Sequence, residues 1–135
     1  MNIEYKTIKW FNKKELVELF TSVGWVEESA KYPHRLEMAM RCSNAVFSAW
    51  DGDKLVGLLS AIDDSMHAYV TYLLVEPAYQ KQGIGTFLLK MYEERYRGYK
   101  KELKTEESEE YYKRFNYKID STGMVKNDLP DRDMR

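Results

Sequence analysis

The sequence contains very little cysteine, and this scarcity excludes two classes of small protein. Cys42 is the only cysteine among 135 residues. A single thiol cannot form an internal disulfide, and it cannot by itself hold a structural zinc ion. We therefore expect neither a disulfide framework nor a metal site, which suits a protein of the reducing cytosol.

The chain also lacks an excess of either charge and a long apolar run. Its 21 Lys and Arg residues balance 22 Asp and Glu residues, which leaves a net charge of −1. Domains that bind nucleic acids usually carry a basic excess, so we expect no nucleic-acid partner. No run approaches the roughly 18 apolar residues that a membrane span needs, and the N-terminus has no apolar segment of signal-peptide type. These absences predict a cytoplasmic protein without a membrane partner.

The remaining composition is typical of one globular unit. A length of 135 residues with 44% apolar content is enough for one core. No repeat, low-complexity tract or linker divides the chain. We expect a single domain over residues 1–135, with a loose polar tail from about residue 130.

Hydrophobic spacing predicts an alternation of strands and helices. Period-two alternation and turn residues indicate strands over 3–9, 45–50, 54–62 and 67–75, the last three forming an antiparallel meander. Helical spacing and end signals indicate helices that begin near Asn12, Pro33, Gly83 and Ser108. Short strands over 102–104, 117–120 and 124–126 complete the pattern. This order predicts an α/β fold of the α+β type, with a mixed, largely antiparallel central sheet of about six to seven strands and about four helices.

The stretch QKQGIGT lies between a predicted strand and the most regular amphipathic helix of the chain. N–H groups in the first turn of a helix have no partner within the helix, and the helix dipole adds positive potential there. Glycine lets the backbone approach an anion closely. The stretch therefore predicts a phosphate cradle. It is made of Gln80, Lys81, Gln82, Gly83, Ile84, Gly85 and Thr86.

Two nucleotide-binding motifs do not fit this stretch. A P-loop needs the string GxxxxGK[ST], which is absent from the sequence. A dinucleotide fingerprint needs a third glycine or alanine where Leu88 stands, and it must directly follow a strand, whereas the predicted strand ends at Val75.

The longer stretch LLVEPAYQKQGIGTFLL resembles the pyrophosphate-loop motif of the GNAT superfamily of N-acetyltransferases. In that motif Gln/Arg-x-x-Gly-x-Gly/Ala opens a long helix, and Gln80-x-x-Gly83-x-Gly85 matches it. FSAWDGDKLVGLLSAI is similar to the second and third strands of the family, and EEYYKRFNYK is similar to its C-terminal FYxKxGF segment. The resemblance covers most of the chain, is weakest over the first 40 residues and the tail, and implies the GNAT acyltransferase fold.

The resemblance also implies a reaction and a set of site residues. The reaction is transfer of an acetyl group from acetyl-CoA (coenzyme A) to a primary amine of a small molecule or a protein. Main-chain groups of Leu73, Leu74 and Val75 would bind the pantetheine arm, and the cradle would bind the diphosphate. Tyr112 matches the tyrosine of FYxKxGF and would protonate the leaving thiolate, since a hydroxyl with an ordinary pKa of about 10 stays protonated at neutral pH.

The chain departs from the pattern of the family at several positions. Asn116 replaces a glycine, and asparagine also tolerates the left-handed conformation. Thr105 stands where the family often has asparagine, and Tyr69 stands where some relatives have a glutamate base. The base therefore stays open among Glu76, His67 and water.

Other readings of the sequence remain. A non-catalytic, sensory or regulatory module that binds acyl-CoA is the alternative to the enzyme. An interaction domain without a cofactor is a third reading, which the intact loop disfavours. The acceptor amine is not readable: four residues of the early segment either line its pocket or pack in the core, namely Trp10, Trp25, Tyr32 and Met38. Many relatives dimerise, so a homodimer is a further expectation.

Overall fold

The computed structural model of the protein describes residues 2–105 and 108–133. The elements follow in the order β1 (Ile3–Lys6), α1 (Lys13–Ser22), α2 (Val26–Lys31), α3 (Pro33–Cys42), β2 (Ala45–Asp51), β3 (Lys54–Asp63), β4 (His67–Val75), the 3-10 turn η1 (Pro77–Tyr79), α4 (Ile84–Arg95), β5 (Lys100–Glu102) and α5 (Glu109–Lys113). Within these described ranges, no helix has both the length and the apolar character to cross a membrane.

The sheet has five strands in the spatial order β1-β2-β3-β4-β5. Neighbours are antiparallel as far as β4, and β5 runs parallel to β4. The predicted mixed, largely antiparallel sheet and its β2–β3–β4 meander are therefore confirmed. Residues 2–105 and 108–133 contain five strands, fewer than the six to seven predicted, and five α-helices, where about four were predicted.

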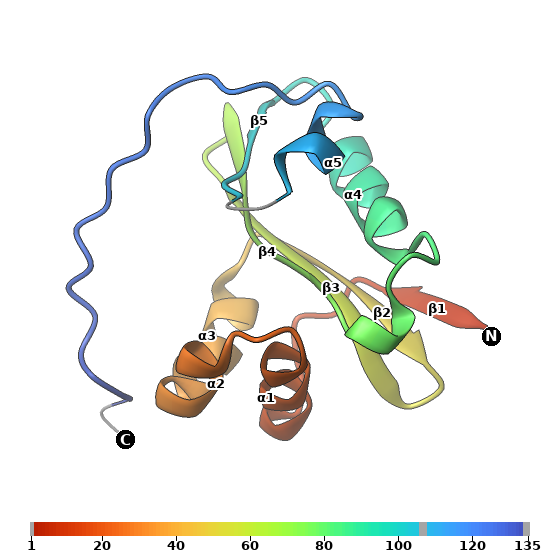
Figure 1. Ribbon diagram of the computed structural model, residues 1–135, viewed down its shortest axis with the longest axis vertical. Coiled ribbons are helices and arrows are strands. Elements are labelled where there is room, and N and C mark those ends of the chain that lie inside the picture. Colours follow the sequence, from red (N-terminus) through yellow and green to blue (C-terminus); the bar gives the residue numbers. More distant parts are fainter. Residues whose placement is uncertain (1, 106–107, 134–135) are drawn as a thin grey trace.

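The two missing strands are those predicted over 117–120 and 124–126. Residues 117–133 contain neither helix nor strand. The chain leaves α5 through Asn116, whose φ is +70°, and runs past β5 toward α2 and α3 (Figure 1). A strand is stable only beside a partner strand, and this path provides none. Apolar side chains of the segment consequently stay exposed, Met124 at 90% and Val125 at 75%.

The sheet separates two apolar cores. Figure 1 shows α1, α2 and α3 on one side of the sheet, with α4 and α5 on the other. On the α4 side, Leu88 and Tyr92 are fully buried against the sheet. On the α1 side, Leu16, Phe20 and Leu58 are fully buried. Both faces of the central strands are thus covered, which explains why β2 and β3 are buried along almost their whole length.

Local signals place α1 and α3, but not α2. The Asn12 side chain accepts a hydrogen bond from the Lys14 N–H at 2.8 Å, which confirms it as the cap of α1, and Pro33 occupies the first turn of α3. Helix α2 has six residues and no side-chain cap, so it is too short for its hydrophobic periodicity to be recognised in the sequence. A tertiary contact supports it, because the Thr21 hydroxyl donates to Ser29 Oγ at 2.9 Å.

The C-terminal segment is tied to the loop between α2 and α3. The Tyr32 hydroxyl donates to the Pro130 carbonyl at 2.5 Å. The Asp133 N–H donates to the Lys31 carbonyl at 2.7 Å, and the His34 N–H donates to Asp133 Oδ2 at 2.6 Å. Residues 134–135, the end of the expected polar tail, lie outside the described residues.

Candidate active site

The predicted cradle forms a tight turn that leads into α4. Lys81 has a φ of +64°, and Gly83 caps the helix in the left-handed conformation with a φ of +85°. This positive φ suits glycine, and a Cβ built on Gly83 would meet nothing within 4 Å. The cap makes no side-chain hydrogen bond, so the first-turn N–H groups have no internal partner. The structure thus presents unpartnered donors in front of open space.

Side chains of the loop stabilise the turn itself. Gln80 Nε2 donates to the Val75 carbonyl at 2.8 Å and closes the loop onto the end of β4. The Tyr79 hydroxyl donates to Asp51 Oδ2 at 2.6 Å and fixes the loop to the β2–β3 hairpin. The amide of Gln82 reaches the Ala78 carbonyl at 3.5 Å. These bonds leave main-chain groups as the principal donors of the turn.

Strand β4 carries a bulge that decides which way its side chains face. Ser60 pairs with Tyr72 while Ala61 pairs with Val70, so Thr71 is an extra residue. The Thr71 hydroxyl donates to the Ser60 carbonyl at 3.1 Å, and the two hydroxyl oxygens lie 2.6 Å apart. The extra residue shifts the alternation of the strand. Tyr72 therefore packs with the α1 side, and Leu73 packs with the α4 side.

Beyond the bulge, β4 has a free edge. Strand β5 pairs with β4 only from His67 to Tyr69, although β4 continues to Val75. The Glu76 N–H donates to the Val56 carbonyl of β3 at 2.9 Å. Because alternate residues of an antiparallel strand point their backbone groups the same way, Leu74 faces β3. By the same alternation, the main-chain groups of Leu73 and Val75 point toward the gap that β5 leaves open.

Helix α5 brings two tyrosines to this gap. Tyr111 and Tyr112 pack against the same core as Leu73 and Val75. The Tyr111 hydroxyl lies 3.0 Å from Thr86 Oγ1 at the start of α4, which ties α5 to the loop. No hydrogen bond of the Tyr112 hydroxyl occurs within the described ranges. Burial, followed by the nearby Tyr111, raises the pKa of Tyr112 to about 12, so its hydroxyl stays protonated at neutral pH.

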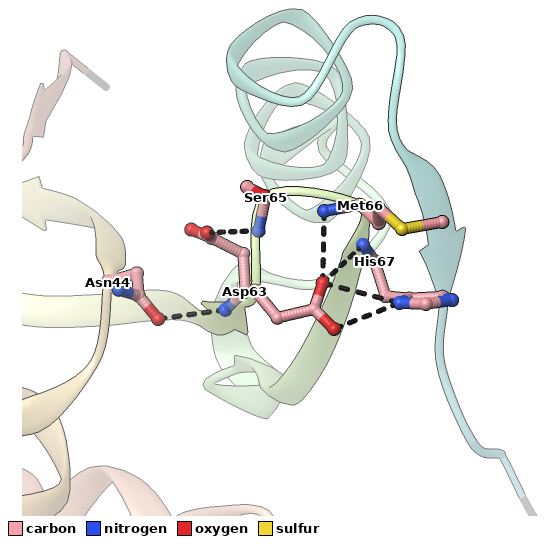
Figure 2. A network of polar contacts seen from close by, with 6 residues as sticks. Asn44, Asp63, Ser65, Met66 and His67 are labelled. Atoms are coloured by element: carbon pink, nitrogen blue, oxygen red, sulfur yellow. Dashed lines mark hydrogen bonds and ion pairs between the residues drawn. The ribbon is translucent and has the colours of Figure 1, made fainter.

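The two side chains considered as bases lie elsewhere. His67 begins β4, where its Nδ1 lies 3.0 Å from Asp64 Oδ2 (Figure 2). The Asp64 carboxylate also accepts from the Met66 and His67 N–H groups, and these bonds hold its pKa well below its usual range. Glu76 pairs with Lys54 at 3.3 Å beside the β2–β3 hairpin. Neither side chain borders the gap between Leu73 and β5.

A pocket of about 750 Å³ opens on the opposite face of β4. Its wall is formed by Glu28 of α2, Arg35 of α3, Tyr69 and Tyr72 of β4, Lys104 after β5, and residues 125–130 of the C-terminal segment. Neither Glu28 nor Arg35 belongs to a recognisable sequence motif, so neither was predicted as a site residue.

The four early residues considered for an acceptor pocket divide into two groups. Trp25 packs edge-on against Tyr72, with ring centroids 5.2 Å apart, and Tyr32 anchors the segment that closes this pocket. Trp10 is 71% exposed and lies under Arg41, whose guanidinium also contacts Met38. The structure thus associates Trp25 and Tyr32 with the pocket, and Trp10 and Met38 with a separate surface.

Comparisons with known proteins agree with this geometry. The sequence profile described as Acetyltransferase (GNAT) family matches residues 9–117. No curated protein matches the chain in sequence. Among solved structures, a GNAT family acetyltransferase from Streptococcus pneumoniae is 31% identical, with a TM-score of 0.79 over 96% of this chain and 100% of that one.

More distant structures share the fold. The PaiA N-acetyltransferase of Thermoplasma acidophilum, solved in complex with coenzyme A, is 17% identical, with a TM-score of 0.74 over 91% of this chain and 94% of that one. An aminoglycoside acetyltransferase from an uncultured soil metagenomic sample, solved with sisomicin, is 17% identical, with a TM-score of 0.67 over 93% of this chain and 95% of that one. The glycine-capped turn, the divergence of β4 from β5 and the matched span of 9–117 lead to one conclusion: this chain belongs to the acetyltransferase (GNAT) family.

Proposed function

We propose that the protein transfers an acetyl group from acetyl-CoA to a primary amine. The observation that carries the proposal is the convergence of three features at one corner. These are the glycine-capped start of α4, the edge of β4 that β5 leaves beyond Tyr69, and the Tyr112 hydroxyl on α5, which makes no hydrogen bond within residues 2–105 and 108–133. A diphosphate requires the hydrogen-bond donors of the turn, an amide-bearing arm requires the strand edge, and a thiolate requires a proton donor.

The turn fits a diphosphate. The N–H groups of Ile84, Gly85 and Thr86 belong to the first turn of α4, where the helix dipole favours an anion. A Cβ on Gly85 would lie at ordinary contact distance from the Val75 side chain, 3.5 Å, and from the Tyr111 hydroxyl, 3.7 Å, so alanine would also fit at this position. Lys81 is exposed beside the turn and supplies a positive charge. These groups would hold the two phosphates mainly through main-chain donors.

The edge of β4 fits the pantetheine arm. The arm contains amides that can pair with a strand edge as a further strand would. Leu73 directs its main-chain groups toward the gap, and Val75 directs its N–H there while its carbonyl accepts from Gln80 Nε2. The main-chain groups of Leu74 are directed toward β3. Leu73 and Val75 are therefore the main-chain partners in this proposal, and Leu74 contributes as a buried side chain of the α1-side core.

Tyr112 has the properties of a general acid. Bound acetyl-CoA would supply the thioester, whose carbon–sulfur bond breaks as a carbon–nitrogen bond to the amine forms. Overall, an ammonium ion and a thioester become an amide, a thiol and one released proton. The Tyr112 hydroxyl holds its proton because burial raises its pKa to about 12, and it can donate this proton to the thiolate sulfur. The attacking ammonium loses two protons in all: one returns to the tyrosinate through solvent, and the other is the proton released.

A non-catalytic module that binds acyl-CoA is the second candidate. It is favoured by one observation, namely that Glu76 pairs with Lys54 and that His67 contacts Asp64, both away from the gap. Such a module would share the cradle and the strand edge but would not turn over an amine.

Two measurements test the proposal in order. Calorimetric titration with acetyl-CoA should give saturable binding, and amine-dependent thiol release should follow with an amine panel. Binding without turnover on any amine would favour the non-catalytic module. Absence of binding would refute both candidates.

A further inference from the structure

The pocket on the α2–α3 side of β4 carries charges of both signs. Its cations are Arg35, Lys104 and Lys126, and its anions are Glu28 and Asp128. None of these five forms an ion pair with another described residue. Charges that gather without partners around one opening favour a ligand that supplies the complementary charges.

This pocket adjoins the gap on β4 from the opposite face. Tyr72 lines the pocket, while its neighbour Leu73 faces the α4 side and the gap. Glu28 lines the pocket together with Tyr72, whose pKa is raised by burial and then by the charge of Glu28. Arg35 belongs to the next helix and lines another part of the same opening.

The C-terminal segment completes the pocket. Residues 125–130 form its outer wall, and the hydrogen bonds of Tyr32 and His34 hold that segment against the start of α3. Lys126 and Asp128 therefore reach the pocket only because the chain returns from α5 across β5. The segment that was predicted to close the sheet contributes to ligand selection in this arrangement.

We propose that this pocket is the acceptor site, and that it selects an amine that carries its own anionic group, such as the carboxylate of an amino acid. This inference rests on the proposed acetyl transfer. Glu28 holds the ammonium beside Tyr72, and Arg35 binds the anionic group, since a guanidinium pairs with a carboxylate through two parallel hydrogen bonds. A diamine or an apolar amine could pair its ammonium with Glu28 but would offer no anionic group to Arg35.

The test compares acceptors that differ only in a carboxylate. Matched pairs are L-lysine with 1,5-diaminopentane, and L-tyrosine with tyramine. Thiol release should favour the amino acid in kcat/KM by about tenfold or more, the effect of a charge-assisted hydrogen bond. Arg35→Met keeps an unbranched apolar side chain of similar length and should reduce this preference to less than about twofold, with the affinity for coenzyme A unchanged. Arg97→Met is the matched control, because Arg97 is exposed and pairs with Glu94 away from the pocket.

Equal use of both members of each pair, or an undiminished preference in Arg35→Met, would overturn the proposal. A second readout does not depend on turnover. The indole N–H resonance of Trp25, which packs against Tyr72, should shift when L-lysine or L-tyrosine is added to the wild type. Less shift is expected with the decarboxylated amines and with Arg35→Met. If coenzyme A binds but no amine reacts, a selective Trp25 shift still supports the pocket, and the absence of a shift refutes it.

Discussion

The two faces of β4 differ in how their functional groups are assembled. On the α4 side, the turn before α4 and the edge of β4 present main-chain groups from one continuous stretch, 73–86. On the α2–α3 side, the pocket collects side chains from segments as distant as Glu28 and Pro130. Main-chain chemistry leaves a local pattern of glycines and a helix start, whereas a pocket built from distant side chains leaves no local pattern.

The two sites differ because one ligand has a fixed chemical structure. The diphosphate and the amide-bearing arm belong to the cofactor and do not vary, so a turn and a strand edge can bind them through the backbone. The acceptor is bound through side chains such as Arg35, which can change without disturbing the fold because Arg35 is exposed. The following predictions test this division, from the largest expected effect to the smallest.

Gly83→Asp should have the largest effect. A carboxylate at this position would stand in the open space before the first-turn N–H groups and repel the diphosphate. Like charges in contact cost several kcal/mol, so affinity for coenzyme A should fall by about a thousandfold. Calorimetric titration measures this loss. Gly52→Asp is the control, because Gly52 also has a positive φ and open space around it but lies in the β2–β3 turn. Unchanged affinity in Gly83→Asp would mean that the diphosphate binds elsewhere.

Tyr112→Phe should lower kcat by about a hundredfold or more, the usual effect of removing a general acid, while the affinity for coenzyme A is retained. Steady-state kinetics with acetyl-CoA and an accepted amine measure it. Tyr111→Phe is the neighbouring control and should act mainly on cofactor affinity, because Tyr111 contacts Thr86. A larger loss of kcat in Tyr111→Phe than in Tyr112→Phe would reverse their assigned roles.

The raised pKa of Tyr112 also predicts a dependence on pH. A tyrosine whose folded pKa of about 12 exceeds its ordinary value of about 10 binds its proton more tightly in the folded state. Its contribution to stability is therefore present below about pH 10 and is lost as pH rises toward 12. Chemical denaturation of the wild type and Tyr112→Phe at pH 8 and pH 11 measures the difference. The wild type should lose more stability than the variant over this interval, and equal losses would contradict the assignment.

Thr71→Val should test the bulge that separates the two faces. It removes both hydroxyl contacts to Ser60 while keeping a β-branched side chain. The free energy of unfolding should fall by about 1 kcal/mol, with an added cost for the buried Ser60 hydroxyl left unpaired. Thr122→Val, on the exposed C-terminal segment, should change stability by less than about 0.5 kcal/mol. A Thr71→Val protein of wild-type stability would show that the bulge does not depend on these bonds.

Tyr32→Phe should have the smallest effect, and this effect should be confined to the pocket face. It removes the hydrogen bond to the Pro130 carbonyl and keeps the ring, so stability should change by about 1 kcal/mol or less. Hydrogen exchange should increase over residues 125–133, while the affinity for coenzyme A stays unchanged. Tyr99→Phe serves as the control on the opposite side of the sheet. Faster exchange at α4 in Tyr32→Phe would show that the two faces are coupled.

Much of the fold could be predicted from short stretches of sequence. The cap at Asn12, the Pro33 start of α3 and the Gly52 turn all act over a few residues, and each lies where it was predicted. The predictions were wrong where an element depends on distant partners. Helix α2 relies on a contact between Thr21 and Ser29, and the segment over 117–126 finds no neighbouring strand.

The sequence by itself determined the glycine-capped turn before α4, the β2–β3–β4 meander and the placement of Tyr112 on a short helix, because glycine conformations, period-two alternation and helix spacing act between near neighbours. Only the tertiary structure decided that Thr71 is an extra residue, that β5 leaves β4 after Tyr69, and that Glu28 and Arg35 share a pocket with the C-terminal segment. These outcomes depend on strand register and on contacts between segments far apart in the chain. The free energy of such contacts comes from packing and from charges that no single stretch of sequence contains.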